Sequence, residues 1–146
     1  MDAYRISGAS LIDLAGVYRL ERVCFGEDAW SLPDLVITLL WPGQLRLRVM
    51  AGKRFIGFAM GEPVWREGIS MITTIGIDPE FQRQGVASAL LAECESRLPG
   101  ECIRLTVRED NEPAIQLYKK FGYQQKARLA DYYRNGRAGI LMEKSR

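Results

Sequence analysis

The hydrophobic pattern of this chain changes its period at Asp78-Pro79. Before that point three strand-like segments follow one another, near residues 45–49, 55–60 and 69–77, with turn residues between them. In the first segment apolar side chains alternate with arginines, which is typical of a half-buried strand. After that point apolar residues recur at helical spacing. A run of strands followed by strand–helix units predicts an α+β domain with one mixed sheet.

The rest of the chain completes this architecture. Its 146 residues contain no repeat, linker or low-complexity tract, so we expect a single domain, residues 1–146. The sheet is expected to be mixed but mostly antiparallel, with about six or seven strands and about four flanking helices. The expected helices cover about residues 10–23, 32–41, 86–98 and 112–121, and the other expected strands lie near residues 3–6, 103–107, 123–129 and 138–144.

Composition excludes several classes of function. Histidine is absent, which excludes histidine-based triads and histidine-ligated metal sites. The cysteines Cys24, Cys94 and Cys102 show no CxxC spacing, so we expect neither a metal site nor a redox pair. The net charge of +2 is too small to predict nucleic acid as the partner. With no signal-peptide pattern and no apolar run near the roughly 20 residues that span a bilayer, we expect a cytoplasmic protein that binds no membrane.

The most informative stretch is residues 75–87, where a strand, a tight turn, a polar loop and a glycine lead into a helix. A helix N-terminus presents unpaired backbone N–H groups and a partial positive charge, which suit a phosphate or pyrophosphate. Gly85 permits a close backbone approach or a positive φ, and Ala87 keeps the first turn free of bulk. The loop side chains that could add donors are Gln82, Arg83 and Gln84. An ordinary glycine at a loop-to-helix junction fits the same pattern.

A second segment, residues 107–123, follows the next strand and makes a resemblance clear. The chain resembles the GNAT superfamily of N-acetyltransferases, which take the acetyl group from acetyl-CoA. The Gln/Arg-x-x-Gly-x-Gly/Ala loop of that family is matched by residues 82–87. The helical element of the family is matched by Asn111, Ala114, Leu117, Tyr118, Gly122 and Tyr123. Within the superfamily the chain is most similar to the ribosomal-protein N-terminal-alanine acetyltransferases, on Ala29-Trp30-Ser31, Ile77-Asp78-Pro79 and Tyr132-Tyr133.

The resemblance implies a site for acetyl-CoA and a proton donor. The strand at residues 75–77 would hold the pantetheine arm and the acetyl carbonyl, and the loop would hold the pyrophosphate. The implied cofactor-binding residues are Ile75, Gly76, Ile77, Gln82, Arg83, Gln84, Gly85, Val86, Ala87, Ser88 and Asn111. Asn111 also fits a plain helix N-cap. Tyr118 would be the general acid that protonates the leaving thiolate. Spacing alone favours a core position for Tyr118, because it shares a helical face with Ile115 and Phe121.

The chain departs from the resembled branch at one position. That branch carries a glutamate on the strand before Asn111, where it deprotonates the amine through water, and this chain has Thr106 there. Glu62, or one of the loop carboxylates Glu109 and Asp110, could replace it. A water held by Thr106 and backbone carbonyls could instead carry the proton away, and this is the alternative we favour. An amine with an already low pKa, such as a peptide α-amino group near 8, would need less help.

The resemblance also implies that the first helix pair and the last hairpin form the acceptor groove. Trp30, Trp65 and the run Tyr132-Tyr133-Arg134 lie in loops or at element ends, where binding surfaces tend to lie. Asp131 and the pair Glu27-Asp28 could hold a substrate ammonium group. In a hairpin turn, however, Trp65 more often packs across the strands.

The first-choice function is acetyl transfer to a protein or peptide N-terminal α-amino group, for example that of a ribosomal protein, by direct attack. A small-molecule amine is the alternative acceptor. A non-catalytic acyl-CoA-binding sensor is the rival from another class, kept open by Thr106 and opposed by Tyr118. The sequence leaves the acyl-chain preference and the oligomeric state open.

Overall fold

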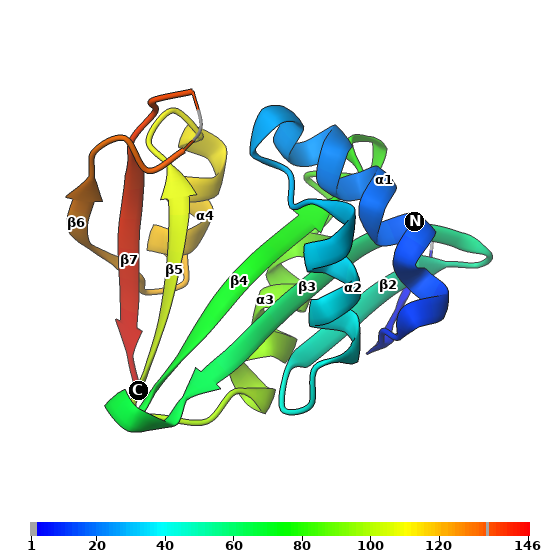
Figure 1. Ribbon diagram of the computed structural model, residues 1–146, viewed down its shortest axis with the longest axis horizontal. Coiled ribbons are helices and arrows are strands. Elements are labelled where there is room, and N and C mark those ends of the chain that lie inside the picture. Colours follow the sequence, from blue (N-terminus) through cyan, green and yellow to red (C-terminus); the bar gives the residue numbers. More distant parts are fainter. Residues whose placement is uncertain (1–2, 134) are drawn as a thin grey trace.

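The computed structural model describes residues 3–133 and 135–146 (Figure 1). Within these ranges seven strands form one sheet in the order β1-β2-β3-β4-β5-β7-β6. The strands are β1 (Arg5–Gly8), β2 (Leu45–Ala51), β3 (Arg54–Val64), β4 (Ile69–Ile77), β5 (Cys102–Arg108), β6 (Gln124–Leu129) and β7 (Gly139–Ser145). The helices are α1 (Leu14–Phe25), α2 (Leu32–Leu40), α3 (Val86–Arg97) and α4 (Glu112–Lys120), with 3-10 turns η1 (Leu11–Asp13), η2 (Gly26–Asp28), η3 (Trp65–Glu67) and η4 (Pro79–Phe81).

This architecture confirms the predicted α+β fold with one mixed, mostly antiparallel sheet. All neighbouring strands run antiparallel except β4 and β5. Two boundaries differ from the expectation. The first helix begins as the η1 turn before α1 continues it, and β3 extends to Val64 although Gly61 and Pro63 usually interrupt a strand. The partner strand explains the second difference, because Pro63 still lies opposite Ser70 of β4.

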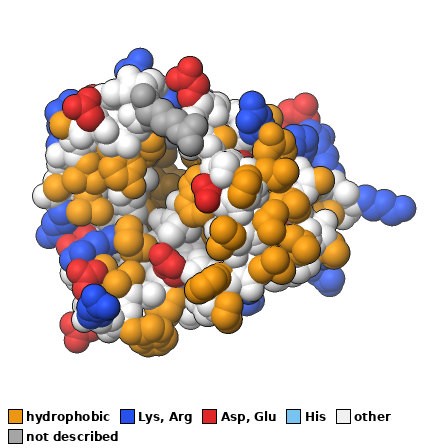
Figure 2. All heavy atoms as spheres, in the orientation of Figure 1, with side chains coloured by type: hydrophobic (Ala, Val, Ile, Leu, Met, Phe, Trp, Pro, Cys, Tyr) orange, Lys and Arg blue, Asp and Glu red, His pale blue; other side chains and the backbone are white. Residues whose placement is uncertain are grey.

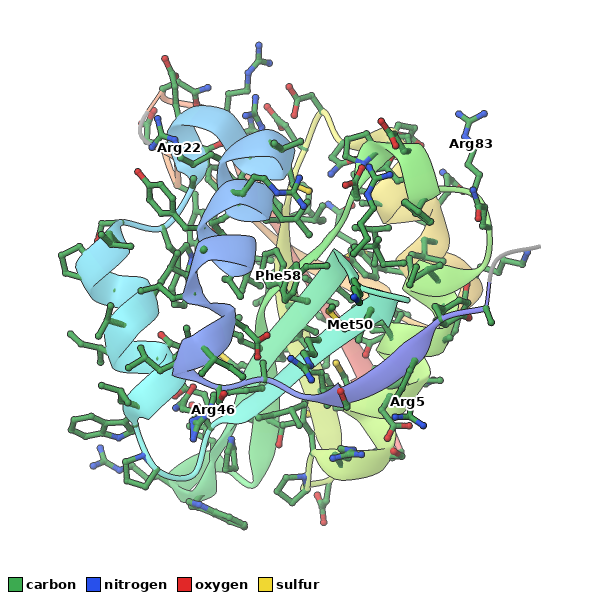
Figure 3. The ribbon with its side chains drawn as sticks, turned by 90° about the vertical axis from the view of Figure 1, so that its right-hand side faces the viewer. Arg5, Arg22, Arg46, Met50, Phe58 and Arg83 are labelled. Atoms are coloured by element: carbon green, nitrogen blue, oxygen red, sulfur yellow. The ribbon has the colours of Figure 1, made fainter. Side chains whose placement is uncertain are left out.

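Two helix pairs cover opposite faces of the sheet, as Figure 1 shows. Helices α3 and α4 lie on one face, where they form the larger core with β2, β3, β4, β5 and β7. Helices α1 and α2 lie on the other face, over β3. Phe58 projects from β3 towards these helices (Figure 3). Phe58 and Met60 form a core cluster with Val17 and Leu20 of α1. The second pair therefore covers only the half of the sheet that ends at β4.

The predicted caps are confirmed for two helices. The Ser31 hydroxyl accepts the Asp34 N–H at 3.3 Å at the start of α2, and Asn111 Oδ1 accepts the Ala114 N–H at 3.3 Å at the start of α4. These side chains satisfy amide groups that a helix N-terminus otherwise leaves unpaired. The longest helices in the described part of the chain have 12 residues, and none is long and apolar enough to cross a membrane.

Candidate active site

Strands β4 and β5 part from each other along their length, and the opening between them is the most distinctive feature of the sheet (Figure 1). They pair only over three residues, Ile69–Met71 with Cys102–Arg104. A β-bulge lies just beyond this paired segment. On β3, Met60 is opposite Thr74 and the next residue, Gly61, is opposite Ile72, so Thr73 is an extra residue on β4. A bulge bends its strand and increases its twist, which accounts for the divergence of β4 from β5.

The far half of β4 forms one wall of the opening. Beyond Met71 the edge of β4 that faces β5 has no strand partner, so backbone N–H and C=O groups along this edge are open to a ligand. The opposite edge stays paired with β3, where Ile75 lies opposite Ala59 and Gly76 opposite Phe58. The structure thus places Ile75, Gly76 and Ile77, predicted to bind the cofactor, on the part of β4 that is not paired with β5.

The loop after β4 brings a helix N-terminus to the same end of the opening. Gly85 caps α3 with φ of 82°, one of the two possibilities that the sequence left open for this glycine, and Arg83 also has a positive φ of 63°. The first hydrogen bond of α3 runs from the Ala89 N–H to the Gly85 carbonyl. The amides of the preceding helical residues, Val86 to Ser88, therefore have no acceptor within the helix and are available to an anion.

Two of the loop side chains predicted as donors to an anion form hydrogen bonds with nearby backbone carbonyls. Gln82 Nε2 donates to the Ile77 carbonyl at 3.1 Å, and Gln84 Nε2 donates to the Glu80 carbonyl at 3.3 Å. Both amides thus help to fix the loop, which leaves the backbone N–H groups as its main donors. Arg83 projects outward from the loop into solvent (Figure 3).

Tyr118, the predicted general acid, lies on α4 with its side chain in the core. It is 7% exposed, and its ring meets that of Tyr123 edge to face with 5.9 Å between the ring centroids. No described residue forms a hydrogen bond with its hydroxyl group. Burial, with smaller contributions from Cys94 and Tyr133, raises the pKa of Tyr118 above its usual range. The hydroxyl is therefore protonated at neutral pH, as a proton donor must be.

The candidates for the proton acceptor are spread over different elements. Thr106 lies on β5 opposite Leu141 of β7. Glu62 lies on β3, two residues after Met60 and just past the register shift, and accepts a hydrogen bond from Gln44 Nε2 at 2.7 Å. Glu109 and Asp110 lie on the loop after β5, and each accepts hydrogen bonds from an arginine. A hydrogen bond from Arg128 lowers the pKa of Glu109, and one from Arg108 lowers the pKa of Asp110, which makes both weaker bases.

The cysteine thiols are not activated. Burial raises the pKa of Cys24 to about 11 and that of Cys94 to about 12. Cys24 Sγ donates to the Ile77 carbonyl at 3.4 Å, so it lies beside β4 as a neutral thiol. Because the thiolate is the nucleophilic form, neither residue is suited to carry a covalent acyl group at neutral pH. The described residues also hold no cluster of three or more potential metal ligands.

A pocket of about 540 Å³ lies between the α1–α2 connection and the β6–β7 loop, on the face opposite α3 and α4. Figure 2 shows the surface hollowed between the part that carries α1 and α2 and the part that carries β6 and β7. Its lining residues are Asp28, Ala29, Trp30, Ser31, Asp34, Ile37, Thr38, Tyr132 and Tyr133. The rings of Tyr132 and Tyr133 meet edge to face at 4.9 Å between centroids.

This pocket brings together part of the acceptor groove predicted from the sequence. Trp30, Asp28 and the two tyrosines meet there, whereas Trp65 lies 76% exposed in η3, outside the lining. Glu27 and Asp131 are also absent from the lining. Arg134, which the sequence placed with the tyrosines, lies outside the described residues.

Sequence reasoning missed Glu21, a buried carboxylate on α1. The Glu21 carboxylate accepts hydrogen bonds from the Thr74 hydroxyl and the Trp30 backbone N–H, each at 3.0 Å, and so connects β4 with a loop that lines the pocket. Burial raises its pKa, although both hydrogen bonds act in the opposite direction. A signal was present, because Glu21 follows Val17 and Leu20 at the helical spacing of the apolar face of α1.

Comparisons with known proteins agree with this geometry. Residues 14–123 match the acetyltransferase (GNAT) family. N-alpha-acetyltransferase RimI of Mycobacterium tuberculosis is 30% identical over 126 residues, which cover 79% of this chain and 75% of that protein. The ribosomal-protein-S18-alanine N-acetyltransferase of Escherichia coli superposes with a TM-score of 0.85 at 26% identity, covering 98% and 94% of the two chains. Arabidopsis thaliana NAA60 in complex with acetyl-CoA shares the fold, with a TM-score of 0.86, 18% identity and 98% coverage of both chains.

Proposed function

Because this chain belongs to the acetyltransferase (GNAT) family and is an acetyl-CoA-dependent N-acetyltransferase, we propose that its acceptor is the α-amino group of a protein or peptide N-terminus. The observation that carries the proposal is the pocket between the α1–α2 connection and the β6–β7 loop, which is open at the surface (Figure 2). A chain end needs a groove that admits the amine and lets the following residues leave. Two relatives named for N-terminal acetylation support the same acceptor class.

Acetyl-CoA enters the opening between β4 and β5 from the side of α3. The free amides of Val86 to Ser88 at the start of α3 receive the pyrophosphate, and Gly85 lets the loop turn towards it. The unpaired edge of β4 at residues 75–77 provides hydrogen bonds for the amide-bearing pantetheine arm. Asn111 stays mainly a cap for α4, since its side-chain oxygen already accepts the Ala114 N–H. This arrangement places the thioester in the opening between β4 and β5, with the acceptor pocket on the face of the sheet opposite α3.

The reaction is a direct transfer. The neutral amine attacks the thioester carbonyl carbon, the new C–N bond forms, and the C–S bond breaks as the thiolate leaves. Tyr118, whose hydroxyl is protonated at neutral pH, donates its proton to that sulfur. The amine proton leaves through water held near Thr106, because Glu109 and Asp110 are weakened by their arginine partners. Glu62 is the alternative base, and an unchanged pH–rate profile in Glu62→Gln would remove it.

Thiol release from acetyl-CoA tests the proposal directly. Short peptides with free Ala, Ser, Met or Gly N-termini are compared with the same peptides blocked at the N-terminus and with a panel of small amines. Turnover confined to the free peptides is the expected result. Turnover confined to small amines would overturn the acceptor class. Binding of acetyl-CoA without turnover on any amine would favour an acyl-CoA sensor instead.

A further inference from the structure

Asp28 is a buried carboxylate with one oxygen unused. Its side chain is 3% exposed at the end of η2, and Oδ2 accepts a hydrogen bond from Arg108 Nη1 at 2.8 Å. Oδ1 is buried as well and has no hydrogen-bond partner among the described residues. An anionic oxygen removed from water without a partner is costly, so such groups usually have a ligand. The free oxygen therefore points to a donor that binds there.

The position of Asp28 suits the acceptor rather than the cofactor. Asp28 belongs to the connection between α1 and α2, and Arg108 is the last residue of β5. Their ion pair therefore joins the α1–α2 connection to β5 on the face that carries the acceptor pocket. Asp28 itself lines that pocket.

The charges around the pocket favour a cation. Asp28 and Asp34 are both in its lining, and its described lining residues include no lysine or arginine. Arg108 engages one oxygen of Asp28 and also donates to Asp110, so its positive charge is shared between two carboxylates. The aromatic rings of Trp30, Tyr132 and Tyr133 provide the apolar remainder of the surface. A protonated amine on an otherwise uncharged chain end matches this combination.

We propose that Asp28 Oδ1 is the binding site for the α-ammonium group of the acceptor, while Oδ2 remains paired with Arg108. This inference rests on the proposed function, since it assigns the residue that recognises an N-terminus in the same pocket. Asp28 holds the amine at the opening between β4 and β5 before the amine loses its proton. N-terminal recognition then depends on the charge of the amine, in addition to contacts with the residues that follow it.

Binding of two matched peptides tests this role separately from turnover. One is a short peptide with a free N-terminal alanine, and the other carries a propionyl group in its place, which removes only the amino group. Affinities are measured by calorimetry with the enzyme saturated with CoA. We expect the wild type to prefer the free amine by about 10- to 100-fold, as for a hydrogen bond between charged partners. Asp28→Asn should reduce that preference to about 3-fold or less, while Asp34→Asn, at the exposed edge of the pocket, should retain it.

A purely structural role would give a different pattern. If Asp28 only anchors Arg108, Asp28→Asn weakens both peptides equally and leaves the preference unchanged, which would overturn the inference. Arg108→Gln provides a second test should Asp28→Asn fail to fold. It leaves the carboxylate in place with both oxygens free, so the preference for the amine should persist or increase, and its loss would overturn the inference too. A wild type that binds neither peptide would instead overturn the proposed acceptor class.

Discussion

The Glu21 carboxylate on α1 accepts a hydrogen bond from the Thr74 hydroxyl on β4, with 3.0 Å between the two oxygens. Its other oxygen accepts the backbone N–H of Trp30, also at 3.0 Å. One buried side chain therefore joins the helix, the strand beside the cofactor opening and the segment that lines the acceptor pocket. Because burial raises the pKa of Glu21, the protonation state of this junction depends on pH.

Glu21→Gln should flatten the pH dependence of stability. The raised pKa means that the folded protein keeps this proton when the unfolded chain has lost it. The free energy of unfolding therefore falls as pH rises above the ordinary carboxyl value of about 4.3, until pH passes the raised pKa. Each unit of elevation costs about 1.4 kcal/mol. Glutamine does not titrate, so urea unfolding between pH 4.5 and 8 should show less decline in the variant. If the free energy of unfolding declined equally with pH in Glu21→Gln and in the exposed control Glu27→Gln, this prediction would be wrong.

Removal of the hydroxyl group should affect the stability of the protein differently at the adjacent residues Thr73 and Thr74. Thr73 Oγ1 is buried without a partner among the described residues, whereas Thr74 Oγ1 donates to Glu21. Thr73→Val replaces an unsatisfied polar group with a methyl of similar size, so stability should stay equal or rise by about 1 kcal/mol. Thr74→Val leaves a buried carboxylate short of a donor and should cost about 1–3 kcal/mol. Urea unfolding of both variants measures this, and equal losses would refute the assignment.

Local sequence patterns predicted the elements of this fold because their causes are local. The alternation of apolar and polar residues predicted β2, and the helical spacing of apolar residues predicted α3. Ser31 and Asn111 predicted two helix starts, because each side chain accepts a hydrogen bond from a nearby backbone N–H. For Gly85 the sequence allowed a positive φ or a close backbone approach, and the structure shows the positive φ. The order of elements then restricted the fold to one mixed sheet with helices on both faces.

The parts of the site that sequence reasoning missed depend on contacts between distant segments. The bulge at Thr73 exists only relative to β3, because Met60 and Gly61 pair with residues on either side of it. The ion pair between Asp28 and Arg108 joins residues that are 80 positions apart. No periodicity within either segment predicts such a contact. The motif residues, and Asp28 as a candidate to hold the substrate ammonium group, could be located from the sequence, whereas Glu21 and the pairing of Asp28 with Arg108 needed the structure.

Tyr118→Phe should impair chemistry while sparing the fold. Its hydroxyl forms no hydrogen bond with a described residue, so stability should change little. Loss of the proton donor should lower kcat by about 100-fold or more, with acetyl-CoA affinity nearly unchanged. Tyr123→Phe is the matched control, because its hydroxyl donates to Glu95 Oε2 at 2.9 Å and its ring packs against Tyr118. That variant should lose about 1–2 kcal/mol of stability and keep its kcat. Steady-state kinetics showing an equal kcat in both variants would remove Tyr118 as the acid.

Gly85→Ala should weaken acetyl-CoA binding through the backbone alone. Gly85 has φ of 82°, and a Cβ added there would meet no atom within 4 Å, so the substitution introduces strain without a clash. A left-handed conformation costs a residue with a side chain about 1–2 kcal/mol. Relief of that strain should pull the loop away from the geometry that aims the first amides of α3 at the pyrophosphate. Calorimetry should therefore show lower affinity for acetyl-CoA, together with a lower free energy of unfolding. Gly8→Ala, at a strand position with equal space and no positive φ, should change neither quantity, and a matching loss there would show that the effect is not specific to the loop.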